Sequence, residues 1–237
     1  LDRGTSIYSY QKHKPLTPAS NVKIFTSGPA LILLGLNYKF ETIILSKGNN
    51  LFIKGNGDPS LSLDNLDSLA KLVSISFETI DTLIADESTF DSNQFGPGWM
   101  WDEGDEWYSA EVSALSVNDN CIDFIVNPTY PGSPINIEIH PKSNFYNITN
   151  TGTTISDTSE YVELKIIRDW KNNKNSFHVS GAIMDTTSID TVIRNISNPT
   201  LFTGSLFEQL LIQNGLRINK TGKGSNSKSS SLVAIHY

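Results

Sequence analysis

Short runs of apolar and β-branched residues, each bounded by Gly, Pro, Asn or Ser, fill most of this 237-residue chain beyond residue 40. They lie at residues 40–45, 51–53, 79–85, 121–126, 135–139 and 161–167. Each run is too short for a typical helix but has the length and composition of a strand. Helical periodicity is confined to residues 63–75 and 202–212, apart from one segment near the N-terminus. The sequence therefore predicts an α+β fold that is rich in β-structure.

The strongest helix signal lies near the N-terminus, after a short strand that we expect at residues 4–10. Residues 17–20 offer a capping side chain and a proline at a first-turn position. Apolar residues then recur over residues 22–34, and Gly35 ends the pattern. Pro29 lacks the amide that would bond to the preceding turn, so we expect a kink or break there.

Composition excludes several classes of protein. The chain has 18 Lys and Arg against 25 Asp and Glu, a net charge of −7, which argues against a nucleic-acid partner. No apolar run approaches the roughly 20 residues of a membrane span. The single cysteine, Cys121, excludes an internal disulfide and a cysteine-based zinc site. The four histidines show no metal-binding spacing, so we predict no metal ion and no cofactor.

Ser20 and Lys23 form an S-x-x-K motif where the N-terminal helix is expected to begin. A hydroxyl in the first turn lies beside free backbone amides and the positive end of the helix dipole, which favours an oxyanion. Lys23 falls on the same face one turn later, and its amine could take the Ser20 proton if burial lowered its pKa. The ordinary structural alternative is an N-cap serine followed by a surface lysine.

Further segments follow this motif in a specific order, and together they resemble one known family. They are residues 15–26, Leu34-Gly35, Phe40-Glu41-Thr42, residues 55–61, residues 86–91, residues 96–102, Tyr108-Ser109-Ala110 and residues 113–116. In this order they resemble the D-Ala-D-Ala carboxypeptidases of peptidase family S13, the class C low-molecular-mass penicillin-binding proteins. The resemblance is clear over residues 4–127 and looser beyond.

The resemblance implies a serine-type D-alanyl-D-alanine carboxypeptidase, with endopeptidase activity as a second option, acting on peptidoglycan stem peptides. Ser20 would attack the carbonyl of the penultimate D-Ala to give an acyl-enzyme, with Lys23 as the base. β-Lactams would acylate Ser20 as covalent inhibitors. The implied location is the periplasm or the extracytoplasmic cell envelope.

The resemblance also implies a domain organisation. Residues 1–39 would be the start of a β-lactamase/transpeptidase-like domain with its active-site helix, and residues 40–237 a large β-rich insertion. We expect the chain to be a fragment that stops before the first domain resumes, and to be nearly inactive when isolated.

Two segments match catalytic sequence motifs, but we do not expect either of them to be catalytic. Ser116-Val117-Asn118 reads S-x-N and Lys220-Thr221-Gly222 reads K-T-G, both of which accompany S-x-x-K in penicillin-binding proteins. Lys220-Thr221-Gly222 opens a Gly/Ser-rich stretch, residues 222–231, which predicts a surface loop. In the resembling family the S-A-L-S-x-N segment lies in the insertion, and the catalytic S-x-N follows an H-x-S-P-P-L segment whose approach resembles residues 231–237. The catalytic second and third motifs are thus expected beyond Tyr237.

A dense patch of aromatic and acidic residues around Trp101 offers a candidate substrate pocket. Counting from Trp101, the family places an Asp two residues on and an aromatic seven residues on, near the pocket for the third residue of the stem peptide. These positions are Glu103 and Tyr108, with Asp102 as a possible substitute for the acid. A carboxylate there would pair with the ammonium of a diaminopimelyl side chain. The structural alternative is a packed aromatic cluster with a solvated acidic rim.

Two other functions stay open from the sequence. A β-lactamase-type serine hydrolase is disfavoured, because a long β-rich insertion directly after the S-x-x-K helix is not that family's plan. The other is a non-catalytic wall-binding or scaffold protein on the same fold. An H-x-S-P-P-L segment, then S-x-N and K-T-G, after Tyr237 would favour the carboxypeptidase.

Overall fold

The computed structural model describes residues 4–225 and 230–237. The chain forms two compact units, residues 1–39 and residues 40–237, which are described separately. The boundary between them falls at the position that the family resemblance implied. The assignment of the two units to a transpeptidase-like domain and an insertion stays a prediction.

The first unit contains one helix, α1 (Val22–Leu34), which follows directly on the 3-10 turn η1 (Ala19–Asn21). Gly35 ends the helix with a φ of 81°, a conformation that glycine adopts without strain, and its amide bonds to the Leu31 carbonyl. The helix predicted near the N-terminus is thus confirmed. No residue of α1 is buried.

Three details of this unit differ from expectation. Residues 4–10 form no strand, and no sheet of the described residues includes them. The turn begins at Pro18 without a capping side chain. The helix also continues through Pro29, so the expected break does not occur.

The second unit begins with a five-stranded sheet of order β14-β4-β2-β1-β15. Its strands are β1 (Thr42–Lys47), β2 (Asn50–Gly55), β4 (Thr82–Asp86), β14 (Thr221–Lys223) and β15 (Ser231–His236). The hairpin of β1 and β2 is confirmed and turns at Gly48, whose φ is 58°. Beside the sheet, β3 (Thr79–Ile80) pairs in parallel with β13 (Arg217–Ile218).

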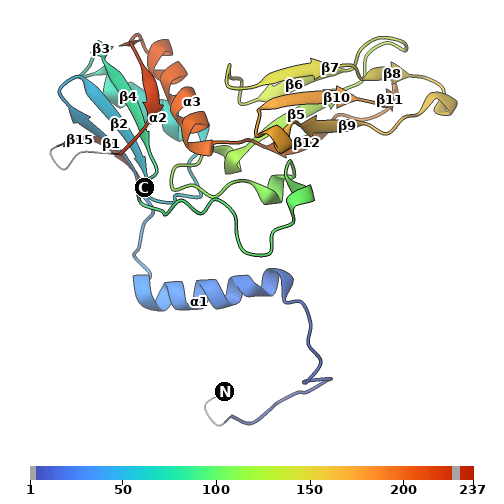
Figure 1. The fold of residues 1–237 in the computed structure, drawn as a ribbon, viewed down its shortest axis with the longest axis horizontal. Coiled ribbons are helices and arrows are strands. Elements are labelled where there is room, and N and C mark those ends of the chain that lie inside the picture. The colour runs from blue at the N-terminus through green and yellow to red at the C-terminus, as the bar shows by residue number, and fades with distance from the viewer. Residues whose placement is uncertain (1–3, 226–229) are drawn as a thin grey trace. The chain divides into compact units, whose positions relative to one another are not determined.

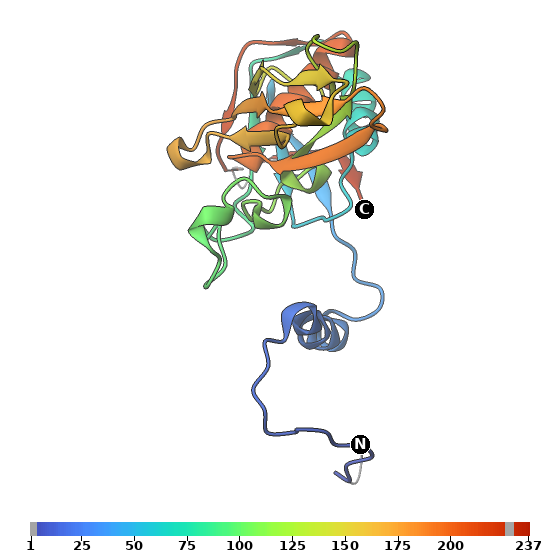
Figure 2. The ribbon, with the colours of Figure 1, turned by 90° about the vertical axis from the view of Figure 1, so that its right-hand side faces the viewer.

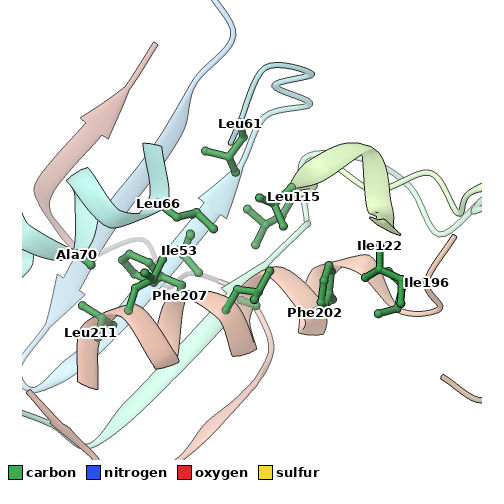
Figure 3. Packing of buried hydrophobic residues seen from close by; sticks show 14 of the residues in the cluster. Ile53, Leu61, Leu66, Ala70, Leu115, Ile122, Ile196, Phe202, Phe207 and Leu211 are labelled. Carbon is green, nitrogen blue, oxygen red and sulfur yellow. The ribbon is translucent and has the colours of Figure 1, made fainter. Parts of the chain in front are cut away.

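Two helices cover this sheet and bury most of its core. Helix α2 (Leu63–Ser74) starts with a capping box between Ser62 and Asn65, and α3 (Pro199–Gln213) is capped by Asn198. The helices pack against each other, α2 against β15 and α3 against β4 and β14. Figure 3 shows the interlocked side chains, with Leu66 and Ala70 of α2 facing Phe207 and Leu211 of α3. Both helices were predicted.

The remaining strands form three small sheets that lie together in both ribbon views (Figures 1 and 2). The first is β12 (Asp190–Asn195), β5 (Cys121–Asn127) and β6 (Asn136–His140); the second is β7 (Asn147–Asn150), β10 (Ser176–Ser180) and β9 (Lys165–Arg168); the third is β11 (Ala182–Met184) and β8 (Thr153–Ile155). Phe124 of β5 and Phe177 of β10 pack with ring centroids 5.2 Å apart, which joins two of the sheets. The predicted strand at residues 161–167 is shorter than expected and begins only at Lys165.

Short 3-10 turns lie in the loops of the second unit, and the first two carry the patch around Trp101. These are η2 (Trp101–Glu103), η3 (Trp107–Ser109), η4 (Asn118–Asn120), η5 (Thr158–Glu160) and η6 (Trp170–Asn172). Over the described residues, no helix is long and apolar enough to span a membrane.

The expectation that the K-T-G segment lies in a surface loop is wrong. Thr221 and Gly222 lie in β14, which pairs in parallel with β4 at the edge of the five-stranded sheet, not in a loop. The pairing partner, Leu83, is far away in sequence, so local composition could not reveal it. Residues 226–229 of the expected loop lie outside the described residues.

Candidate active-site residues and the aromatic-acidic patch

Ser20 and Lys23 lie where the 3-10 turn passes into α1. Ser20 is the middle residue of η1 and Lys23 the second residue of α1, so the three-residue spacing places them on one side of a continuous helical segment. Both residues are exposed. Ala19, just before Ser20, has a φ of 45°, which is unusual for a residue with a side chain. The arrangement can present a serine hydroxyl at a helix N-terminus with an amine beside it.

The candidate substrate residues belong to the second unit. Asp102 and Glu103 lie in η2 and Tyr108 in η3. Slight desolvation, the Glu103 and Glu106 carboxylates, a hydrogen bond with Glu103 and the more distant Asp102 together raise the pKa of Tyr108. Glu103 and Tyr108 therefore interact, and Asp102 is exposed beside Glu103 in the chain. Their role in binding substrate stays a prediction.

A buried arginine holds this patch in place. Arg168 of β9 is 5% exposed and donates to the Gly104 carbonyl at 2.8 Å and to Oδ1 of Asn195 at 3.1 Å. Burial lowers the pKa of Arg168, against the opposing attraction of nearby carboxylates, Glu111 first and then Asp105. Asn195 in turn donates to the Glu106 carbonyl at 2.8 Å. The two 3-10 turns are thereby tied to β9 and β12.

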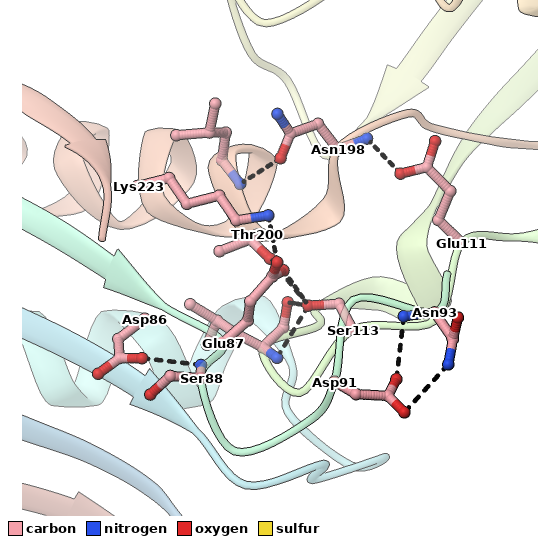
Figure 4. Close-up of polar contacts among 12 residues, drawn as sticks. Asp86, Glu87, Ser88, Asp91, Asn93, Glu111, Ser113, Asn198, Thr200 and Lys223 are labelled. Atoms are coloured by element: carbon pink, nitrogen blue, oxygen red, sulfur yellow. Dashed lines mark hydrogen bonds and ion pairs between the residues drawn. The ribbon is translucent and has the colours of Figure 1, made fainter. Parts of the chain in front are cut away.

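A second polar cluster lies between the sheet and the start of α3 (Figure 4). Glu87 accepts hydrogen bonds from Thr200 and from Ser113, the latter at 3.1 Å, and forms an ion pair with Lys223. Desolvation raises the pKa of Glu87, but the contacts with Lys223, Thr200 and Ser113 outweigh it, so the pKa lies below its ordinary value. The cluster joins β14, α3 and two loops.

Glu111 also stabilises the N-terminal end of α3. It is buried and accepts from the Ser197 hydroxyl at 2.7 Å and from the Asn198 backbone amide at 2.9 Å. A carboxylate at the start of a helix stabilises it through these amides and the dipole. Glu87, Glu111 and Arg168 were not among the residues singled out from the sequence. Glu87 falls within residues 86–91, one of the segments that carry the family resemblance, and Arg168 directly follows the strand predicted at residues 161–167, but neither position revealed its partners.

Two cavities flank the pair of tryptophans Trp101 and Trp170. One of about 630 Å³ includes Asp102 in its lining, and the other, of about 320 Å³, is closed by Phe95 and Trp99. Neither Glu103 nor Tyr108 lines them.

The remaining reactive groups have structural partners. The Ser116 hydroxyl donates to the Ser113 carbonyl at 3.1 Å and the Asn118 side chain donates to the Cys121 carbonyl at 3.0 Å. Burial, with lesser contributions from nearby Asp residues, raises the pKa of the Cys121 thiol to about 12, so it is not a nucleophile at neutral pH. Within residues 4–225 and 230–237, no group of three His, Cys, Asp or Glu is placed to hold a metal ion.

Comparisons with known proteins identify relatives of this chain. The D-alanyl-D-alanine carboxypeptidase of Actinomadura sp. (strain R39) is 29% identical over 232 residues, which cover 91% of this chain and 42% of that protein. Penicillin-sensitive carboxypeptidase A of Dictyostelium discoideum is 25% identical, covering 93% of this chain and 47% of that protein. The chain thus spans a little under half the length of these curated relatives.

A solved structure shares the fold, and a family model covers nearly the whole chain. The crystal structure of penicillin binding protein 4 (dacB) from Haemophilus influenzae matches with a TM-score of 0.75 at 24% identity, over 93% of this chain and 51% of that one. The same protein complexed with a novel β-lactam matches with a TM-score of 0.65 at 22% identity, over 92% of this chain and 49% of that one. The model of the D-Ala-D-Ala carboxypeptidase 3 (S13) family matches residues 1–236. The resemblance noted in the sequence is confirmed, and the chain belongs to the D-Ala-D-Ala carboxypeptidase 3 (S13) family.

Proposed function

We propose that the protein containing this chain is a penicillin-binding, serine-type D-alanyl-D-alanine carboxypeptidase that acts on peptidoglycan stem peptides. The observation that carries the proposal is Ser20 in a 3-10 turn that runs into α1, with Lys23 on the same side three residues later. The names of the curated relatives support the substrate class. Endopeptidase cleavage of cross-links is a second reaction open to the same acyl-enzyme chemistry.

The proposed reaction proceeds in two steps. Ser20 Oγ attacks the carbonyl carbon of the penultimate D-Ala while Lys23 takes its proton, and the terminal D-Ala leaves with a proton as its free amine. Water then cleaves the resulting ester and restores the serine hydroxyl. A β-lactam would form the same ester at Ser20 by opening its ring.

Glu103, Asp102 and Tyr108 are proposed to receive the third residue of the stem peptide. The Glu103 carboxylate lies beside the Tyr108 hydroxyl, so the two form a polar pair able to bind an ammonium group. A diaminopimelyl side chain carries such a group. This assignment is independent of Ser20, because the residues belong to the second unit.

The proposed domain organisation rests on the exposed apolar side chains of α1 and on the family resemblance. All of α1's large apolar side chains are exposed, and its own unit offers nothing to cover them: Val22, Ile24, Phe25, Leu31, Ile32, Leu33 and Leu34. A helix that is apolar on every side is normally buried within a larger domain. We infer that α1 packs against further residues outside its unit. Together with the family resemblance, this leads us to propose that residues 1–39 belong to a transpeptidase-like domain and residues 40–237 to an insertion. A peptidoglycan substrate would place the protein in the periplasm or the extracytoplasmic cell envelope.

Fluorescent penicillin labelling of the full-length protein tests the assignment of Ser20. Ser20→Ala should abolish the labelled band on a denaturing gel, because no ester can form. Ser27→Ala is the matched control, since Ser27 is an exposed serine in α1, and it should label like wild type. Labelling that persists in Ser20→Ala would overturn the assignment, as would absence of labelling in the wild-type protein.

A further inference from the structure

An open groove lies over the sheet formed by β7, β10 and β9, and residues of all three strands line it. Figure 1 shows the position of this sheet in the second unit. Its floor is one cross-strand row, in which His178 pairs with Thr149 on one side and with Ile167 on the other. All three residues are exposed and line the cavity of about 630 Å³. Such a volume is within the range of small-ligand sites.

The wall of the groove is aromatic. Trp101, which is 73% exposed, and Trp170 pack with ring centroids 5.5 Å apart and an angle of 49° between the rings. The side chain of Trp170 is held close against Gly104, where an added Cβ would lie 2.4 Å from the indole ring. Trp170 therefore packs against the backbone at Gly104, and Trp101 forms the exposed part of the wall.

The charges along this groove favour a neutral ligand. The Arg168 guanidinium is already bonded to Gly104 and Asn195 and is buried. The Lys171 ammonium lies 5.8 Å from the ring centroid of Trp101 and 5.5 Å from that of Trp170, so the rings already stabilise its charge. The other polar residues of the lining are Asp102, Asp169, Thr149, Ser176 and His178, so the carboxylates of Asp102 and Asp169 balance the charges of Arg168 and Lys171.

We propose that this groove binds the glycan strand of peptidoglycan, a neutral chain of N-acetylated hexosamines. The positively polarised C–H faces of pyranose rings pack well on the negative faces of tryptophan rings. The hydroxyl and acetamide groups of the sugars would bond to Asp102 and Thr149. The proposal rests on the proposed function, which makes a peptide attached to this glycan the substrate.

Titration of the 237-residue chain with chitotetraose, a soluble neutral N-acetylglucosamine tetramer, tests the groove by calorimetry. Wild type should bind it saturably. Trp101→Ala should weaken the affinity about tenfold or more, as expected for loss of a central aromatic contact. The matched control is Trp107→Ala: Trp107 is 57% exposed and lines neither cavity, so its affinity should stay within about twofold of wild type.

A second variant keeps the test independent of folding defects and of the proposed function. Thr149→Phe fills the floor of the groove from an exposed strand position and should abolish chitotetraose binding, while penicillin labelling of the full-length variant stays unchanged. The proposed glycan site would be overturned if wild type showed no saturable binding of chitotetraose. It would also be overturned if Trp107→Ala lost as much affinity as Trp101→Ala. Failure of wild type to label with penicillin would overturn the proposed function and leave the glycan measurement standing.

Discussion

Single carboxylates in this chain act through the partners that the fold supplies. In Glu87, Oε2 accepts hydrogen bonds from Ser113 and Thr200, and Oε1 forms the ion pair with Lys223 (Figure 4). Glu103 instead lies beside Tyr108 at the surface. Glu87 has three side-chain partners from distant parts of the chain and therefore stabilises the fold, whereas Glu103 interacts with a residue only five positions away.

Glu87 should make stability depend on pH. Because folding lowers the pKa of Glu87 below its ordinary value of 4.5, its stabilising effect is present above that pH and is lost as the pH falls through the folded-state pKa. We expect Glu87→Gln to lower the free energy of unfolding at pH 7 by about 1–2 kcal/mol, a range already reduced for solvent screening. The deficit should shrink in acid. Urea titrations at pH 7 and pH 3 would measure this, with Glu138→Gln, an exposed strand position, as the control. A deficit equal at both pH values would show that the carboxylate charge is irrelevant.

Glu103 should determine which stem peptides are cleaved. A charge-assisted hydrogen bond to the substrate ammonium contributes roughly 1.5–3 kcal/mol, so Glu103→Gln should lower kcat/KM about ten- to a hundred-fold in the full-length enzyme. Peptides whose side-chain amine is acetylated should be barely affected. Steady-state kinetics with the paired substrates would measure the difference. Equal losses on both would mean that Glu103 is structural.

Elements of the second unit meet at positions where no side chain fits. Gly55, the last residue of β2, lies against the segment around Ala114, and an added Cβ would stand 2.0 Å from the Ala114 carbonyl oxygen. Gly57, two residues further on, donates its amide to the same carbonyl at 2.8 Å. This close backbone approach joins the five-stranded sheet to the loop that carries Ser113 and Leu115.

Gly55→Ala should therefore destabilise the fold strongly. The methyl group must displace backbone and not a flexible side chain, so we expect a loss of about 3 kcal/mol or more in the free energy of unfolding. Gly222→Ala is the matched control in the same sheet, because nothing lies within 4 Å of its added Cβ, and it should change stability by less than about 0.5 kcal/mol. Thermal and urea unfolding would compare the two. Equal effects would contradict the close approach.

The two units of the molecule differ in how much apolar surface they bury. Helix α2 buries Leu66, Leu69, Ala70 and Val73, whereas α1 buries nothing. A helix of 13 residues without packing is marginal in water. The two units should therefore differ in local stability.

Hydrogen exchange of the 237-residue chain should reveal this difference. Amides of residues 22–34 should exchange about a hundred-fold faster, or more, than those of residues 63–74, because α1 opens without disrupting a core. Mass spectrometry of deuterium uptake would measure both helices in one sample, which makes α2 the internal control. Equal protection of α1 and α2 would show that α1 is packed within this chain.

The sequence by itself determined the features that depend on residues close together along the chain. Helix α1 with Gly35 at its end, the hairpin around Gly48 and the apolar face of α2 all follow from residues within a few positions of one another. The S-x-x-K spacing and the pairing of Glu103 with Tyr108 are also local.

Tertiary structure decided the features that need a distant partner. Residues 4–10 have the composition of a strand but belong to no sheet of the described residues. Thr221–Lys223 has the composition of a loop and becomes a strand because β4 supplies its hydrogen bonds. Thr200 reaches Glu87 across 113 positions. Trp170 meets Trp101 only because β9 carries it there. A backbone group or a charge is stabilised by whatever the fold places beside it, and that neighbour is not encoded in the surrounding residues.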